Sequence, residues 1–228
     1  MLDMRANLGR VQESVARACA RAGRAPDSVL LIAVSKTMEV ERVRLAIAAG
    51  VAALGENRVQ EAKEKIEALG RPVPWHLIGS LQTNKARDAA RLFDWVHSVD
   101  RLDLAQELSR RAHAADRTLN VLLQVNLGDE PQKGGVAVAE LKSLHEVVAA
   151  LPSLSVRGLM AIPPATEQPE HARPYFRRLR ELRDELGLEH CSMGMSADYE
   201  VAIEEGATMV RVGTAIFGPR APRPEAHR

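Results

Sequence analysis

The sequence predicts a single (β/α)8 barrel of the TIM type preceded by an N-terminal helix, and three observations lead to this fold class. Short apolar runs alternate with longer amphipathic segments from about residue 29 to residue 218. Strands that are separated by helices must pair in parallel through crossover connections. Eight such strand–helix units fit into the 228 residues, and eight is the number that closes this barrel.

The first predicted element is a helix within residues 1–25, which we expect to pack on the barrel. This segment is rich in arginine, as an organelle-targeting peptide is. Its apolar residues nevertheless recur at helical spacing, at Leu8, Val11, Val15, Ala18 and Ala22. That spacing favours one apolar helix face over a targeting signal. We expect the barrel domain to occupy residues 26–218, and the Pro-rich, charged residues 219–228 to form a loose tail.

The first barrel strand is predicted at residues 29–35, where VLLIAVS is continuously apolar, like a strand buried on both faces. Further strands are predicted at residues 51–54, 75–78, 95–99, 120–127, 156–161, 190–193 and 209–212. Helices are predicted at residues 39–49, 58–69, 84–92, 101–115, 138–150, 169–186 and 198–205, with a short one from residue 214. An open doubly wound sheet is the alternative. AVSKTMEV stands where the nucleotide-binding version of that fold carries GxGxxG, so the barrel is preferred.

The composition is that of an ordinary globular protein and excludes several classes of function. The net charge is +1 and aromatic residues make up 3% of the chain, so no basic surface or stacking platform for nucleic acid is expected. The longest stretch without a charged residue, 72–84, is too short to cross a membrane. Cys19 and Cys191 stand alone, without ligand spacing. They predict no metal site, no disulfide and a cytoplasmic location.

Lysine is rare in this chain, because only six of its 31 basic residues are lysines. These are Lys36, Lys63, Lys65, Lys85, Lys133 and Lys142. Lys63 and Lys65 lie in RVQEAKEKIEAL and are expected on a solvated helix face, and the same holds for Lys142. Lys36 differs because it follows an apolar strand, where partial burial would favour the neutral amine that attacks a carbonyl. A lysine that merely reaches solvent is the alternative, and the residues alone leave both readings open.

The end of the predicted barrel carries the pattern of a phosphate site. In MVRVGTAIFG, Gly213 and Thr214 open a short helix after the last strand, where barrels of this type bind phosphate. Ser196 precedes another helix and could add a hydroxyl, and it could serve as a plain N-cap at the same time. Arg211 lies inside an apolar run, where burial is costly without a partner. That partner is either a carboxylate in the barrel mouth or an aromatic nitrogen of a ligand.

Six motifs in order and spacing resemble one known family. AVSKT, GENRVQEA, WHLIGSLQTNK, VNLGDEPQKGG, RGLMAI and SMGMSADYEVAIEEGATMVRVGTAIFG are similar to the pyridoxal phosphate homeostasis proteins, across residues 29–218. The family is similar in fold to the N-terminal barrel of alanine racemase, a fold-type III barrel for pyridoxal 5′-phosphate (PLP).

The resemblance implies roles for eight residues. Lys36 would hold PLP covalently as a Schiff base, Arg211 would face the pyridine nitrogen, and three further residues would hold the phosphate, namely Ser196, Gly213 and Thr214. Asn57, His76 and Met160 would line the ring pocket. One departure is visible, because Gly128 stands where the family usually carries serine. Lys133 in the same motif is either a surface lysine or an amine at the cofactor rim.

The expected function is that of a noncatalytic PLP-binding protein that buffers and delivers the cofactor and so maintains vitamin B6 and amino-acid homeostasis. A PLP-dependent racemase or decarboxylase is the alternative, and a Schiff-base aldolase leaves Arg211 unexplained. An arginine at the ring nitrogen keeps that nitrogen unprotonated, which weakens PLP as an electron sink. Few residues follow Gly218, so no second domain is expected to supply an opposite base; Tyr199 is the tyrosine that cannot be dismissed. We expect a monomer that contacts PLP-dependent apo-enzymes transiently.

Overall fold

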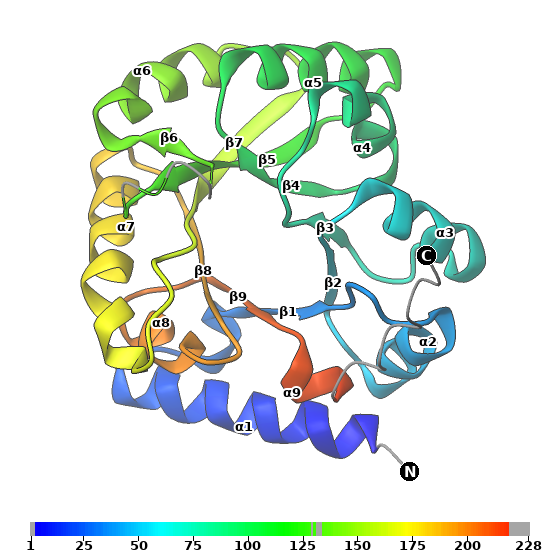
Figure 1. Cartoon of the computed structure of the whole chain (residues 1–228), viewed down its shortest axis with the longest axis vertical. Coiled ribbons are helices and arrows are strands. Elements are labelled where there is room, and N and C mark those ends of the chain that lie inside the picture. The colour runs from blue at the N-terminus through cyan, green and yellow to red at the C-terminus, as the bar shows by residue number, and fades with distance from the viewer. Residues whose placement is uncertain (1–2, 129, 131–133, 219–228) are drawn as a thin grey trace, which may run out of the picture.

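In the computed structural model, eight parallel strands close into a barrel within the described residues, which are 3–128, 130 and 134–218. Figure 1 looks along the barrel and shows the helices arranged outside the ring of strands. The predicted (β/α)8 fold with an N-terminal helix is therefore confirmed. The predicted tail, residues 219–228, and Lys133 lie outside the described residues.

The ring consists of β1 (Leu30–Val34), β2 (Ala53–Glu56), β3 (Trp75–Leu77), β4 (Trp95–Val99), β5 (Leu119–Asn126), β7 (Leu154–Met160), β8 (His190–Met195) and β9 (Met209–Val212). A two-residue strand, β6 (Val136–Ala137), pairs only with β5. The α-helices are α1 (Met4–Arg21), α2 (Val40–Ala49), α3 (Val59–Leu69), α4 (Ala86–Leu92), α5 (Leu102–Ala114), α6 (Val138–Ala149), α7 (Arg173–Glu185), α8 (Tyr199–Glu204) and α9 (Thr214–Phe217). Short 3-10 turns are η1 (Pro26–Ser28), η2 (Thr83–Lys85) and η4 (Pro169–Ala172).

Each strand pairs with its neighbours in parallel, and the ring is closed because its first and last strands pair with each other. β1 pairs with β9, with Ile32 opposite Arg211, and β4 pairs with β5. Between β8 and β9 the register shifts, because three residues of β8 span the distance that two residues of β9 span. This irregularity lies at the end of β8 that carries Ser196.

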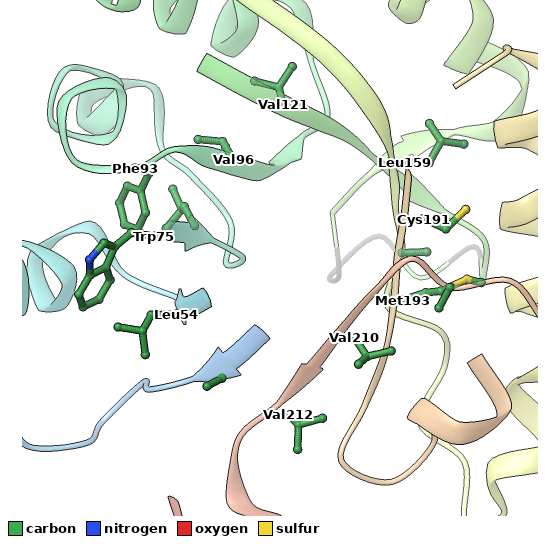
Figure 2. Close-up of a cluster of buried hydrophobic side chains, with 14 of the residues drawn as sticks. Leu54, Trp75, Phe93, Val96, Val121, Leu159, Cys191, Met193, Val210 and Val212 are labelled. Carbon is green, nitrogen blue, oxygen red and sulfur yellow. The ribbon is translucent and has the colours of Figure 1, made fainter. Parts of the chain in front are cut away.

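Strand alternation divides the core into two layers. Alternate residues of the strands face the helices, and Figure 2 shows this outer layer from Leu54 on β2 to Val212 on β9. The other residues face the inside of the barrel. The apolar part of this interior consists of Ile32, Ala53, Leu122, Met160 and Met209. Side chains therefore fill the barrel, as in other barrels of this size.

Helix α1 is fixed to the two helices that follow the last strands. Its apolar face, with Leu8, Val11 and Val15, belongs to the outer core. The side-chain amide of Asn7 donates to the carbonyl of Ile216 in α9 at 2.9 Å. The guanidinium of Arg21 donates to Glu200 and Glu204 of α8 at 2.8 and 2.6 Å. Figure 1 shows α1 running past both helices.

Two strands extend beyond their predicted C-terminal ends. The second strand was predicted at residues 51–54 and lies at Ala53–Glu56, because α2 ends on Gly50 at φ +97° and the amide of Val51 still donates to Ala46 of that helix. The seventh was predicted at residues 190–193 and extends to Met195 through the register shift. Both differences add residues next to the barrel mouth.

Among the described residues, no helix is both long and apolar enough to cross a membrane. Cys19 and Cys191 are both free and buried, and burial raises the pKa of the Cys191 thiol to about 12. Within the same part of the chain, no three His, Cys, Asp or Glu side chains are grouped to hold a metal ion.

Candidate functional site

A cavity of about 170 Å³ opens at the C-terminal ends of the strands. A cavity of about 150 Å³ is enough to hold one benzene ring, so this one can accept a single aromatic ring. Its lining comes from β1, β8 and β9 and from the segments that follow β1, β2, β3, β7, β8 and β9. It consists of Val34, Lys36, Met38, Asn57, Ile78, Ile162, Met195, Ser196, Arg211, Gly213 and Thr214. The structure therefore brings together six of the eight residues predicted for the site.

The charged residues that line this cavity are both cations. Lys36 and Arg211 both line it, and none of its described lining residues carries a carboxylate. The hydroxyl groups of Ser196 and Thr214 add neutral donors on the β8 and β9 side. Two cations and two hydroxyls favour an anionic ligand, and phosphate esters are bound by such donor sets.

Lys36 lies in a turn with an unusual backbone. The next residue, Thr37, has φ +63°, a conformation that a β-branched residue adopts only under constraint. The constraint comes from α3, where a carboxylate oxygen of Glu61 accepts a hydrogen bond from the Thr37 amide at 3.0 Å. The turn therefore directs Lys36 to the cavity at a cost in backbone energy.

The residue before Lys36 is fixed by a buried ion pair. The ammonium of Lys65 donates to the Ser35 carbonyl at 2.7 Å and to Oε1 of Glu56 at 2.6 Å, and the Ser35 hydroxyl donates to the same oxygen at 2.6 Å. Glu56 and Lys65 are 0% and 5% exposed. Burial raises the pKa of Glu56 even though Lys65 and Ser35 oppose the shift.

The expectation that Lys65 lies on a solvated helix face is therefore wrong. Glu56 also points away from the cavity, because it belongs to β2 and faces α3. A signal was present in the sequence. Val59, Ala62 and Lys65 follow each other at intervals of three, which places them on one buried helix face. Lys63 is exposed as expected and pairs with Glu67 at 3.9 Å.

Ser196 connects the ends of β8 and β9. Its hydroxyl oxygen accepts a hydrogen bond from the Gly213 amide at 3.4 Å, whereas the N-cap position of α8 is taken by Asp198. The N-cap role of Ser196 is therefore not realised. Gly194 allows this arrangement, because it has φ +87° and a Cβ there would approach Ala202 Cβ to 2.6 Å. Only glycine lets β8 turn into α8 this closely.

Arg211 has no ion pair among the described residues, so the carboxylate alternative is not realised there. Its Nη1 donates to Ser192 Oγ at 2.6 Å and its Nη2 to the Ala161 carbonyl at 3.0 Å. Burial lowers the pKa of the guanidinium to about 10, which leaves it protonated at neutral pH. A cation held only by neutral acceptors keeps its full charge for a ligand.

His76 and Met160 lie apart from the six residues that meet at the cavity. Met160 belongs to the apolar interior of the barrel, and His76 is 0% exposed and stacks on Trp95 with 5.5 Å between ring centroids. Its Nδ1 lies 2.9 Å from Nε2 of His97, a residue that sequence reasoning missed. The alternation of β4 places His97 on the inner face with Trp95. This alternation alone does not show which residues of other strands meet His97 inside the barrel, so the pair with His76 could not be predicted.

Gly128 and Tyr199 also have definite surroundings. A Cβ on Gly128 would come within 2.7 Å of Pro164 Cγ, so a serine at this position requires the proline to move. Tyr199 is 9% exposed and lines a neighbouring cavity around Glu170 and Asp198, which shares only Ser196 with the cavity of Lys36. Tyr199 is therefore not placed opposite the lysine.

Comparison with known proteins identifies relatives along nearly the whole chain. The family described as alanine racemase, N-terminal domain, matches residues 6–221. A pyridoxal phosphate homeostasis protein of Aquifex aeolicus is 50% identical over 220 residues, which cover 93% of this chain and 96% of the relative.

Two solved structures complete the comparison. PipY of Synechococcus elongatus with PLP bound has a TM-score of 0.81 and 40% identity, covering 90% of this chain and 100% of that one. An alanine racemase of Clostridium difficile shares the fold at a TM-score of 0.73 with 15% identity, over 97% of this chain and 58% of that one. The chain therefore belongs to the pyridoxal phosphate homeostasis protein family, which shares the barrel of the alanine racemase N-terminal domain.

Proposed function

We propose that this protein holds PLP in the barrel cavity and serves PLP homeostasis, storing and delivering the cofactor without catalysing a reaction of its own. The observation that carries the proposal is a ring-sized cavity lined by Lys36, Arg211 and two hydroxyls, with no carboxylate among the described lining residues. That donor set fits an aldehyde, a phosphate and an aromatic nitrogen in one ligand. A homologue of 40% identity binds PLP in the same fold.

In this proposal the polar residues of the cavity bind different parts of PLP. When bound, PLP supplies an aldehyde that forms a Schiff base with an amine, and an aromatic ring that can accept electrons. Lys36 supplies the amine. Ser196, Gly213 and Thr214 bind the phosphate, Arg211 faces the pyridine nitrogen, and Asn57 contacts the ring. His76 and Met160 support the pocket from the barrel interior.

The absence of catalysis is proposed from the base content of the cavity. Racemisation needs a proton acceptor on each face of the substrate carbon. Among the described lining residues, Lys36 is the one amine, and Arg211 stays protonated near neutral pH, so the lining offers no pair of bases for the two faces. We further propose a cytoplasmic monomer that contacts apo-enzymes transiently. The positive charge of the cavity favours retention of an intact anionic cofactor.

The first experiment is borohydride reduction of the PLP-loaded protein, followed by peptide mass analysis. We expect a pyridoxyl mass on the peptide that contains Lys36, and loss of that mass in Lys36→Arg, which keeps the charge. Lys85→Arg, at an exposed lysine outside the cavity, is the matched control and retains the label. A reducible pyridoxyl group on Lys36→Arg protein would refute the assignment.

A second experiment separates the noncatalytic role from a racemase. The PLP-loaded protein is incubated with L-alanine in heavy water, and deuteration at the α-carbon is followed by NMR. We expect exchange no faster than with free PLP. Many turnovers per protein molecule that disappear in Lys36→Ala would establish the racemase in place of the carrier.

A further inference from the structure

A chain of hydrogen bonds crosses the inside of the barrel from β9 to β3. Nη1 of Arg211 donates to Ser192 Oγ at 2.6 Å, and Ser192 Oγ lies 2.9 Å from Nδ1 of His97. Nε2 of His97 lies 2.9 Å from Nδ1 of His76. All four side chains are buried, with at most 4% of their surface exposed. Because barrel interiors are ordinarily apolar, a polar chain of this length needs a reason.

The partners of each group fix the direction of the chain. Arginine can only donate, so the Ser192 oxygen accepts, and its hydroxyl hydrogen is then available to Nδ1 of His97. A neutral His97 carries its proton on Nε2 and donates to Nδ1 of His76. This direction leaves a single group without a partner among the described residues, Nε2 of His76.

The opposite direction is less favourable. It would leave both the Ser192 hydroxyl hydrogen and Nε2 of His76 unpaired in the barrel interior, and each unpaired polar group that is buried lowers stability. It would also turn a histidine N–H toward the positive guanidinium. In the favoured direction, each group of the chain accepts a hydrogen bond on the side that faces Arg211 and donates one on the opposite side.

The histidines add no charge to this chain. Burial lowers the pKa of His76 to about 3 and that of His97 well below its usual range. A carboxylate could hold the guanidinium equally well, but it would cancel the positive charge. Ser192 and the Ala161 carbonyl hold it and leave the charge intact.

We propose that Ser192 and His97 are positioning residues for Arg211, which orient its guanidinium toward the cavity through a one-directional chain of neutral acceptors. Neither residue lines the cavity, so both act through Arg211 and not on the ligand. The part of this inference that concerns PLP rests on the proposed function. The chain itself is a property of the protein alone, and the two are tested separately.

The first test uses the protein without PLP. NMR of histidine ring nitrogens at pH 7 reports the tautomer of each ring, with His97→Asn used to assign the signals. We expect His97 to be neutral with its proton on Nε2 and Nδ1 accepting from Ser192. A proton on Nδ1, or on both nitrogens, would overturn the chain regardless of what the cavity binds.

The second test uses PLP-loaded variants and measures the PLP dissociation constant and the absorption maximum of the bound cofactor. Ser192→Ala and His97→Leu should each weaken PLP binding about tenfold, the size of one lost hydrogen bond in a buried chain, and should shift the absorption maximum. His97→Asn should restore most of both properties, because its amide oxygen can take the place of Nδ1.

Ser109→Ala is the matched control, since it removes a buried hydroxyl that donates to the Pro152 carbonyl at 2.6 Å outside the barrel. It should lower stability and leave PLP binding and the spectrum unchanged. Equal spectra for Ser192→Ala and the unmodified protein, or equal behaviour of Leu and Asn at position 97, would contradict the positioning role. If Lys36 takes no pyridoxyl label while NMR shows the expected tautomer of His97, the proposal that the cavity binds PLP is refuted. The hydrogen-bond chain to Arg211 is then still supported.

Discussion

Two buried cations lie on opposite faces of the barrel wall and are treated differently. Lys65 lies between β2 and α3 and is neutralised by Glu56 at 2.6 Å. Arg211 lies inside the barrel and is held by a serine hydroxyl and a backbone carbonyl. The difference shows which charge belongs to the structure and which is kept for a ligand. A cation paired with a carboxylate fixes a backbone, whereas one on neutral acceptors can still bind an anion.

The largest effect is expected outside the barrel, at the neutralised pair. Glu56→Leu leaves Lys65 buried without its counter-charge and should lower the free energy of unfolding by about 3–5 kcal/mol. The double variant Glu56→Leu/Lys65→Met should regain most of this loss, because two apolar side chains avoid the desolvation that already raises the pKa of Glu56. Urea unfolding of both variants measures the difference. A double variant as unstable as the single one would show that the bond from Lys65 to the Ser35 carbonyl dominates.

The next effect concerns a hydroxyl of the cavity that we expect to bind the phosphate of PLP. Thr214→Ala removes one hydroxyl from the lining and, if this hydroxyl binds phosphate, costs about 1.5–3 kcal/mol, or roughly tenfold to a hundredfold in PLP affinity. Thr214→Ser keeps the hydroxyl and should bind like the unmodified protein. Equilibrium dialysis with PLP and with pyridoxal completes the comparison. If PLP and pyridoxal bind with equal affinity, the phosphate is not bound at Thr214.

The smallest effect is a pH dependence of stability that arises inside the barrel. Burial lowers the pKa of His76 from 6.5 to about 3, so between these values the unfolded chain binds a proton that the folded chain does not. The stabilising contribution is therefore complete above pH 6.5 and is lost as the pH falls. His76 alone should cost about 2 kcal/mol between pH 7 and pH 5. Urea midpoints across this range test the sign, and His76→Asn should flatten the slope.

Much of the site was predictable because it depends on strand order and period. Lys36, Arg211 and Gly213 each follow from a position at or beyond the end of an apolar strand, and parallel strands bring such ends to one mouth. Lys65 was misplaced because the charges of its helix resemble a solvated surface, and only the interval of three to Ala62 indicates burial. His97 was missed because its partner Ser192 lies nearly a hundred residues away and across the barrel.

The attachment of α1 gives the cavity a long-range consequence. Asn7 holds Ile216, and two positions before Ile216 the hydroxyl of Thr214 lines the cavity. Detachment of the N-terminal helix and loss of a ligand are then coupled equilibria, and coupling of this kind is reciprocal. If detachment of α1 weakens ligand binding by some factor, ligand binding lowers the equilibrium constant for detachment by the same factor. The chain near Arg21 should therefore be cut more slowly by a protease when PLP is present, so that occupancy is reported at the far end of the sequence.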